Sequence, residues 1–354
     1  GKIQAGKVGG NWNWLFMNTW KSPSVDINDL GFMQQTNQVI NVLWTGYSFT
    51  EPFSIFRSMH INTNVFSVSD FGANINGIGY DGNIRANFIN MWTGGLGGGG
   101  QYKHVSTSLL RGGPSIYIPN STRFFSHLST DERKALSLTA ITSQSFGKNK
   151  TSRRESYKSE FTLRPTNNLK INLEPEYSKT FTELQYVSSQ EFGDDTRYIF
   201  ATLDQKVLSM SLRADFNITP DLTIQYWGQP FMATGSYKDF KMITDPKADE
   251  YIDRFHEYTA NEISHANDVY SINDGKYSYD IDDPNFSFDE FLSNLVIRWE
   301  FLPGSTAYLV WSQSRDYSET VGEFDVWGNM DNLFSINTPN NTFLVKFSYR
   351  FGLR

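Results

Sequence analysis

The chain has no cysteine among its 354 residues, which excludes a disulfide framework and thiolate metal sites. It also has no run that approaches the roughly 18 consecutive apolar residues a membrane-spanning helix needs. Lysine and arginine total 31 against 38 acidic residues, so the formal net charge is −7. A basic surface typical of nucleic-acid binding is therefore absent, and we expect no nucleic-acid partner.

The common catalytic motifs are missing as well. His256 and His265 lie too far apart for the H-E-x-x-H pattern of a zinc helix, so we interpret them as loop histidines. The glycine run 94–100 lacks the Lys-Ser/Thr pair of a phosphate-binding loop, and no G-x-S-x-G nucleophile motif occurs. We therefore expect no catalytic residue and no organic cofactor, and we expect that this segment is not an enzyme.

Aromatic residues are unusually frequent: 9 Trp, 18 Tyr and 28 Phe make up 16% of the chain, although the mean hydropathy is only −0.45. Polar and apolar residues alternate through 157–164, 169–177, 207–216, 294–301 and 342–351, with Val296 and Leu344 as exceptions. Such alternation is typical of β-strands. These runs approach the 9–11 or so residues with which a strand crosses a bilayer.

One side of each strand repeatedly carries charges of both signs, while the other side is apolar. A soluble sandwich would also show this pattern, but aromatic residues lie near the strand ends, as at the two interfaces of a membrane barrel. The charged side chains are therefore predicted to line a lumen, either as a selectivity lining or, as we favour, as ion pairs that fill it. They are Lys158, Glu160, Arg164, Lys170, Glu174, Glu176, Arg213, Asp215, Arg298, Glu300, Lys346 and Arg350.

Short turns that contain proline alternate with long connections, as in outer-membrane barrels. The prolines are Pro52, Pro165, Pro220 and Pro303, and the long loops are predicted at about 94–119, 178–197, 236–285 and 316–341. We predict one all-β domain over 1–354, a transmembrane antiparallel β-barrel. It should have about 14 or more strands and be incomplete at its N-terminus; an extra strand at 101–110 would bring all four prolines to one side.

The 236–285 loop holds 12 acidic and 5 basic residues, so its net charge equals the −7 of the whole chain. It also holds eight aromatic residues, which favours a folded lid or binding surface over a disordered loop. Two oxygen-rich clusters are weak calcium candidates, but we favour turn capping for the first and a solvated acidic loop for the second. The first consists of Asp26, Asn28 and Asp29, and the second of Asp280, Asp282 and Asp283.

Several longer strings resemble one known family. They are SP at 22–23 with NDLGF at 28–32, LRGGP at 110–114, the 220–235 segment that ends in QPFMATG, SNLVIRWE at 293–300 with PGST at 303–306 and LVW at 309–311, and FLVKFSYRF at 343–351. Together they resemble the C-terminal barrel of a Bacteroidota outer-membrane family known as domain of unknown function 5916. Ser24 and the pair Ala233-Thr234 depart from the family pattern.

The resemblance implies a β-barrel in the bacterial outer membrane, in contact with its lipid. Family members also have an N-terminal β-sandwich similar to carbohydrate-binding family nine, which these 354 residues lack, so we expect a mature product or a fragment. The family supplies no catalytic residue. We expect a scaffold or accessory subunit of a complex with other envelope proteins; the alternatives are a channel or glycan-uptake porin, and a glycan-active enzyme with glycan as its ligand.

Overall fold

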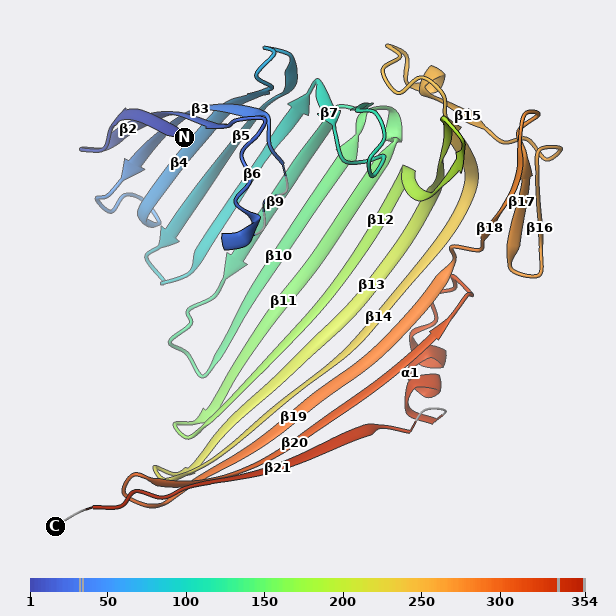
Figure 1. Ribbon diagram of the computed structural model, residues 1–354. Helices are drawn as coiled ribbons and strands as arrows, with labels where there is room; N and C mark the ends of the chain where they lie inside the picture. Colours follow the sequence, from blue (N-terminus) through green and yellow to red (C-terminus); the bar gives the residue numbers. More distant parts are fainter. Residues whose placement is uncertain (32, 34, 336–337, 353–354) are drawn as a thin grey trace.

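The computed structural model describes residues 1–354 except 32, 34, 336–337 and 353–354, and these residues form an antiparallel, almost all-β protein (Figure 1). The predicted all-β class is therefore confirmed. The path of the main sheet runs in chain order through β1 (Lys2–Lys7), β2 (Trp12–Lys21), β3 (Gln38–Phe49), β4 (Phe56–Ser69), β5 (Ile75–Phe88), β6 (Thr93–Tyr102), β9 (Ser121–Ser129), β10 (Leu136–Gly147), β11 (Ser152–Thr166), β12 (Leu169–Phe192), β13 (Asp195–Thr219), β14 (Leu222–Ile243), β19 (Phe286–Leu302), β20 (Ser305–Glu319) and β21 (Asn340–Ser348).

Smaller elements lie at one end of this sheet. The short strand β15 (Phe255–Glu257) pairs with β14. Two small sheets stand apart: β16 (Ile263–Ala266), β17 (Val269–Asn273) and β18 (Ser278–Asp282) form one, and β7 (His104–Ser106) and β8 (Ile116–Ile118) the other. The helices are α1 (Val326–Ser335) and the short 3₁₀ turns η1 (Asn28–Leu30), η2 (Lys148–Lys150) and η3 (Tyr251–Arg254). None of the helices in the described part of the chain has the length and apolar character to span a membrane.

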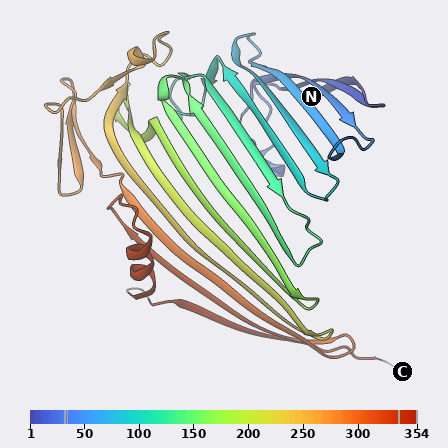
Figure 2. The ribbon, with the colours of Figure 1, turned by 180° about the vertical axis from the view of Figure 1, so that it is seen from behind.

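The sheet is open: the described residues do not close into the barrel that the sequence predicts. Within the described residues, β1 pairs only with β2 and β21 only with β20, which leaves two free edges at opposite ends of the sheet (Figures 1 and 2). The strand directions exclude an antiparallel joint between the two edges. The path contains fifteen strands and every neighbouring pair is antiparallel, so β1 and β21 run in the same direction and cannot join as an antiparallel pair.

Connections differ between the two ends of the strands. At one end, here called the turn side, they are short: 8–11, 50–55, 89–92, 130–135, 167–168, 220–221 and 303–304. At the other end, the loop side, they include the long segments 22–37, 103–120, 244–285 and 320–339. All four prolines singled out in the sequence lie at the turn side, so the predicted asymmetry holds, although the strand that produces it is β6 rather than 101–110.

Two predicted loops are largely strands. The glycine run belongs to β6, where a Cβ on Gly97 would meet the Phe125 ring at 2.5 Å, so the glycines leave room for rings of the neighbouring strand. The loop predicted at 94–119 therefore begins only at residue 103. The loop predicted at 178–197 is the hairpin of β12 and β13, whose two-residue turn has Gly193 at φ +66°.

The other two loop boundaries also need correction. β14 continues to Ile243, so the 236–285 connection starts later than predicted, and much of it is folded into η3 and β15 to β18. β20 continues to Glu319, and α1 occupies the middle of the predicted 316–341 loop, in which positions 336–337 lie outside the described residues. Short turns at 8–11 and 89–92 separate β1 from β2 and β5 from β6, respectively.

Register gives the sheet one apolar face, because directly paired residues point to the same side. Phe216 pairs with Leu169 and Ile224, and the same row continues through Ile297, Leu309 and Val345. Large side chains on this face stay open to the surroundings, for example Leu309 at 44% and Val345 at 60% exposure.

The apolar face forms a band of limited height. In β12 it extends over nine residues, from Leu169 to Tyr177, and in β13 from Phe216 back to Leu208. The next row toward the loop side on the same face is charged, and consists of Glu155, Lys179 and Lys206. This band, bounded by the turns and by a charged row, is the main feature of the sheet.

Both buried hydrophobic clusters lie at the loop side. One joins the small sheet to β13 and β14 through Ile199, Phe240, Ile272 and Ile281. The other places Leu110 and Ile116 of the 103–120 segment against Phe200. Folding at this end therefore relies on the burial of apolar side chains in a core, whereas the apolar side chains of the band stay open to the surroundings.

Replacement of Ile272 by alanine tests this docking. Ile272 is only 2% exposed, and loss of a buried isoleucine of this kind costs about 2–5 kcal/mol. We expect faster hydrogen exchange in β16 to β18 with little change in β3 and β4, measured by mass spectrometry. Ser264→Ala, an exposed position of the same sheet, is the control; equal effects of both substitutions would contradict the assignment.

Candidate binding surface on the loop side

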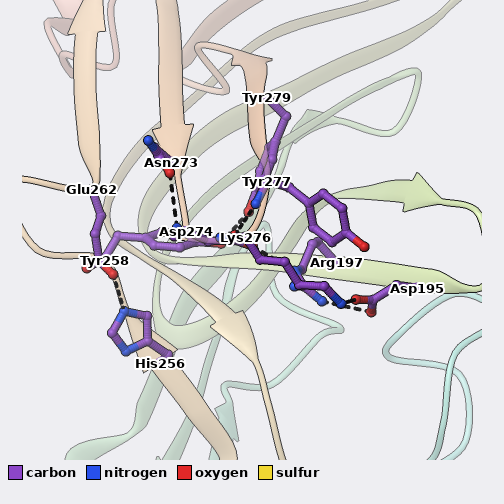
Figure 3. A network of polar contacts seen from close by, with 11 residues as sticks. Asp195, Arg197, His256, Tyr258, Glu262, Asn273, Asp274, Lys276, Tyr277 and Tyr279 are labelled. Carbon is purple, nitrogen blue, oxygen red and sulfur yellow. Dashed lines mark hydrogen bonds and ion pairs between the residues drawn. The ribbon is translucent and has the colours of Figure 1, made fainter.

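The loop side is built on a platform formed by the extensions of β12, β13 and β14. Thr182 is the last β12 residue paired with β11, so the three strands continue past their neighbours toward the loop side (Figure 1). The small sheet β16 to β18 packs against this platform and is tied to it by polar side chains (Figure 3).

Arg197 is the centre of that connection. Its Nε donates a hydrogen bond to Asp274 at 2.7 Å, and its Nη1 donates to Asp195 at 2.8 Å. Lys276 Nζ donates to the other Asp195 oxygen at 2.7 Å. Figure 3 shows these charges together beside Tyr277. The Tyr277 ring stacks on the Phe192 ring, with the ring centroids 4.1 Å apart.

Asp274 is held in its ionised form. Its side chain is 1% exposed, and burial by itself would raise the pKa of the carboxyl group. The backbone N–H groups of Tyr277 and Lys276 and the Arg197 guanidinium outweigh that cost and leave the pKa of Asp274 below its usual value. Likewise, the hydrogen bond from Lys276 lowers the pKa of Asp195 against the opposing effect of burial.

A hollow of about 750 Å³ opens beside the platform. Lys241 forms part of its wall with only 3% of its side chain exposed, donates to Thr202 Oγ1 at 3.3 Å, and lies 3.9 Å from the Glu257 carboxylate. Burial lowers the pKa of Lys241, against the opposing charges of Glu257, Glu183 and Asp239. A buried amine with a lowered pKa at the wall of a hollow is a typical feature of a ligand-binding site.

The separate loops form one continuous surface because Arg254 links them. Its guanidinium donates to the carbonyls of Ala248 and Asp249 at 3.0 Å or less, and to the carbonyl of Tyr117 in the 103–120 segment at 3.0 Å. The backbone N–H of Tyr117 also donates to the Pro246 carbonyl at 3.0 Å. Sequence patterns could not identify Arg254, Arg197 or Lys241, since none of them lies in a periodic motif.

Helix α1 adds a second part of this surface. Asn329 Nδ2 donates to Ser287 Oγ at 3.1 Å and to Asp289 Oδ1 at 3.0 Å, which anchors the helix on β19. On the same helix Trp327 is 83% exposed. A large aromatic side chain presented in this way is typical of protein contact surfaces.

The charges predicted to line a lumen do share the face opposite the apolar band wherever register fixes them. Lys158 pairs with Glu176, Lys170 with Asp215, and Lys346 with Tyr308, whose other partner is Arg298. Many are neutralised locally, as in Lys158 with Glu160 and Glu174 at 2.7 and 3.1 Å, Arg213 with Asp215 at 3.3 Å, and Arg298 with Glu300 at 2.8 Å. That they line a lumen remains a prediction.

Two of these residues have a local role near the turns. Arg164 donates to the Glu132 carbonyl at 2.9 Å. Arg350 follows β21, and its backbone N–H donates to Ser305 Oγ at 3.0 Å. Neither is paired with a carboxylate among the described residues.

The two clusters predicted as calcium candidates make different contacts. Asp26 Oδ1 accepts hydrogen bonds from the backbone and side chain of Asn28, and Asn28 Oδ1 accepts from the Met33 N–H, so these side chains are engaged in local hydrogen bonds around η1. In the second cluster Asp283 pairs with His265 at 3.1 Å. Asp280, Asp282 and Asp29 join no group of metal-ligating side chains among the described residues.

The contact between the small sheet and the platform should depend on pH through Asp274. Because the folded-state pKa of Asp274 lies below the unfolded value of about 3.9, its ionised form stabilises docking above that pH. This contribution is lost as the pH falls through the folded-state value. Hydrogen exchange in β17 and β18, corrected for the intrinsic rate, should therefore accelerate on acidification below about pH 4.

Asp274→Asn should remove most of that acid dependence, whereas Asp280→Asn on the neighbouring strand should retain it. An unchanged acid response in Asp274→Asn would show that another group controls the docking.

Comparison with known proteins bears on the whole chain. No curated protein matches it. One family model, that of a domain of unknown function, matches residues 1–351, which includes all the motifs from the 22–32 segment to the last strand. The resemblance expected from those motifs is thus confirmed, and the chain belongs to the family DUF5916.

Proposed function

We propose that this sheet forms most of the wall of a β-barrel in the bacterial outer membrane, and that the loop-side surface binds another envelope protein. The protein would then act as a scaffold or accessory subunit of an envelope complex. The observation that carries the proposal is the apolar band, with its open side chains and its nine-residue height in β12. That height matches the 9–11 or so residues with which a strand crosses the hydrocarbon layer.

Aromatic residues at the limits of the band support the same proposal. Tyr157 and Tyr177 form a cross-strand pair next to the charged row, and Phe216 and Trp299 lie toward the turn side. Aromatic girdles of this kind are typical of the two membrane interfaces. A soluble sheet with such an open apolar face would instead be prone to association.

Closure of the wall requires further strands. Because β1 and β21 run in the same direction, an odd number of additional strands between them would give a fully antiparallel ring. β21 is suited to such a neighbour, since Phe343 and Phe347 are 70% and 73% exposed beside its unpaired edge.

The alternatives receive less support from the side chains. A porin lining is usually dominated by charges that face water, whereas Lys158, Arg213 and Arg298 are each paired with a carboxylate. A glycan-active enzyme needs two free carboxylates across a cleft. In the acidic loop, Asp274 and Glu262 are engaged by Arg197 and His256, respectively.

Two neighbouring aliphatic residues give a matched test of membrane insertion. Ile297 lies on the apolar face, whereas Val296 lies on the opposite face, where its β20 partner is Val310. Ile297 lies in the row of Phe216, near the turn-side limit of the band. Ile297→Lys should therefore destabilise the protein folded in a bilayer by about 1–2 kcal/mol, less than a lysine at the bilayer midplane would, and Val296→Lys should destabilise it less. Equilibrium refolding into lipid vesicles, followed by tryptophan fluorescence, measures the difference; equal losses would contradict membrane insertion.

The scaffold role is tested by photo-crosslinking in intact cells. A photoreactive amino acid at Ile252, which is 73% exposed in η3, or at Trp327 should capture a protein of discrete mass. Ile55, 60% exposed at the turn side, is the control position and should not give that product. A protein that forms no adduct from either loop-side position would be solitary, and the scaffold proposal would fail.

A further inference from the structure

A histidine and two aspartates meet at one end of the small sheet, away from the Arg197 network. His265 lies near the end of β16, Asp268 in the turn that follows, and Asp283 directly after β18. One ligand atom of each residue lies within 4.8 Å of the others. The three side chains come from two separate places in the chain, so the fold of the sheet is what brings them together.

Backbone geometry holds this cluster in place. Asn267 and Asp268 have φ of 54° and 60°, as in a tight two-residue hairpin turn, a conformation that asparagine and aspartate tolerate well. The Asp283 N–H donates to the Asp268 carbonyl at 2.9 Å, which fixes the two aspartates relative to each other.

The side chains are oriented by further contacts. Asp283 Oδ1 accepts the Asn285 N–H at 2.9 Å, so Oδ2 is directed to His265 Nε2 at 3.1 Å. The His265 ring stacks on Tyr270, with centroids 4.2 Å apart. Such outer contacts are the usual means by which metal ligands are oriented.

Charge in the cluster is unbalanced. Only 6% of the Asp283 side chain is exposed, and its single cationic neighbour in the group is His265. The Asp268 carboxylate has no hydrogen bond or ion pair within the described part of the chain. Two carboxylates beside one imidazole therefore retain negative charge even when the histidine is protonated, and a bound dication would compensate it.

We propose that His265, Asp268 and Asp283 bind a divalent transition metal of the zinc type. His265 Nε2 and one oxygen from each aspartate supply three ligands of the N/O kind that Zn²⁺ accepts at about 2.0–2.2 Å. Ca²⁺ instead prefers six to eight or so oxygen ligands and has little affinity for imidazole. Binding replaces the direct contact between His265 and Asp283 and draws Asp268 inward.

The position of the site suggests its use. The metal would join the β16–β17 turn to the end of β18, and so fasten the small sheet at the end remote from Arg197. His265 is 41% exposed at its side chain, so solvent reaches the fourth coordination position. This inference does not depend on insertion into a membrane, because the cluster lies within the small sheet.

Zinc titration of the purified, detergent-solubilised chain tests the site, with isothermal calorimetry as the measurement. The wild type should bind one Zn²⁺ per chain, and an equal concentration of Ca²⁺ should not displace it. Asp268→Asn removes a ligand but keeps a residue that adopts the left-handed turn, so it should fold normally and bind at least about ten-fold more weakly.

Asp280→Asn is the matched control, since Asp280 is a carboxylate of β18 outside the cluster, and its affinity should equal that of the wild type. Hydrogen exchange of residues 263–283 should slow when Zn²⁺ is added to the wild type and remain unchanged in Asp268→Asn. The inference is overturned if the wild type binds no stoichiometric Zn²⁺, if Asp268→Asn binds as tightly as the wild type, or if Asp280→Asn is equally weakened.

Discussion

The arrangement of this protein depends on the separation of apolar and charged side chains onto opposite faces of one antiparallel sheet. Strand geometry enforces it, since successive residues point to opposite sides and a shift by one residue would exchange the faces. Strand after strand, from Leu169 and Phe216 to Val345, the register keeps the aliphatic and aromatic side chains on one side. Among the described residues no second sheet covers that face, which distinguishes it from a soluble sandwich. Near the loop-side limit of the band, Phe324 and Phe334 of the 320–339 segment pack on Tyr177 and Phe291.

The loop side differs from the band in its packing and in its composition. There β12, β13 and β14 continue beyond the charged row, both faces of β13 become buried around Ile199 and Phe200, and the side chains no longer alternate. Polar contacts then set the arrangement: Arg197 ties the small sheet to the platform, and Arg254 ties the loops to one another. The proposed binding role rests on this cross-linked, acidic and aromatic surface.

How much the sequence could reveal follows from this contrast. Where one face is apolar and the other charged, as in 157–164, 207–216 and 294–301, the period of two predicted the strands and placed Lys158, Arg213 and Arg298 together on one face. The alternation disappears where the environment is the same on both faces. The loop-side half of the β12–β13 hairpin therefore shows no strand pattern and is predicted as a loop. The alternation also disappears where glycines of β6 carry no side chain of their own and a neighbouring ring covers them.

Patterns of alternation cannot predict the loop-side contacts, for another reason. Arg197 and Asp274 lie far apart in the sequence and meet only after the small sheet docks, and His265 reaches Asp283 only through the β16 to β18 topology. Composition predicted that the acidic, aromatic segment would be folded, but not which charges would pair. Periodicity also cannot predict whether the sheet closes into a barrel, because closure depends on the number of strands in the sheet.

The most direct test of the account asks what surrounds each face of the sheet. The chain lacks cysteine, so single cysteines can be introduced at Val296 and Ile297 and labelled with a nitroxide in lipid vesicles. Electron paramagnetic resonance then compares collisions with oxygen, which concentrates in hydrocarbon, and with a water-soluble nickel complex. The account predicts that the label at position 297 meets mainly oxygen and the label at 296 does not; equal exposure of both labels to the nickel complex would contradict it.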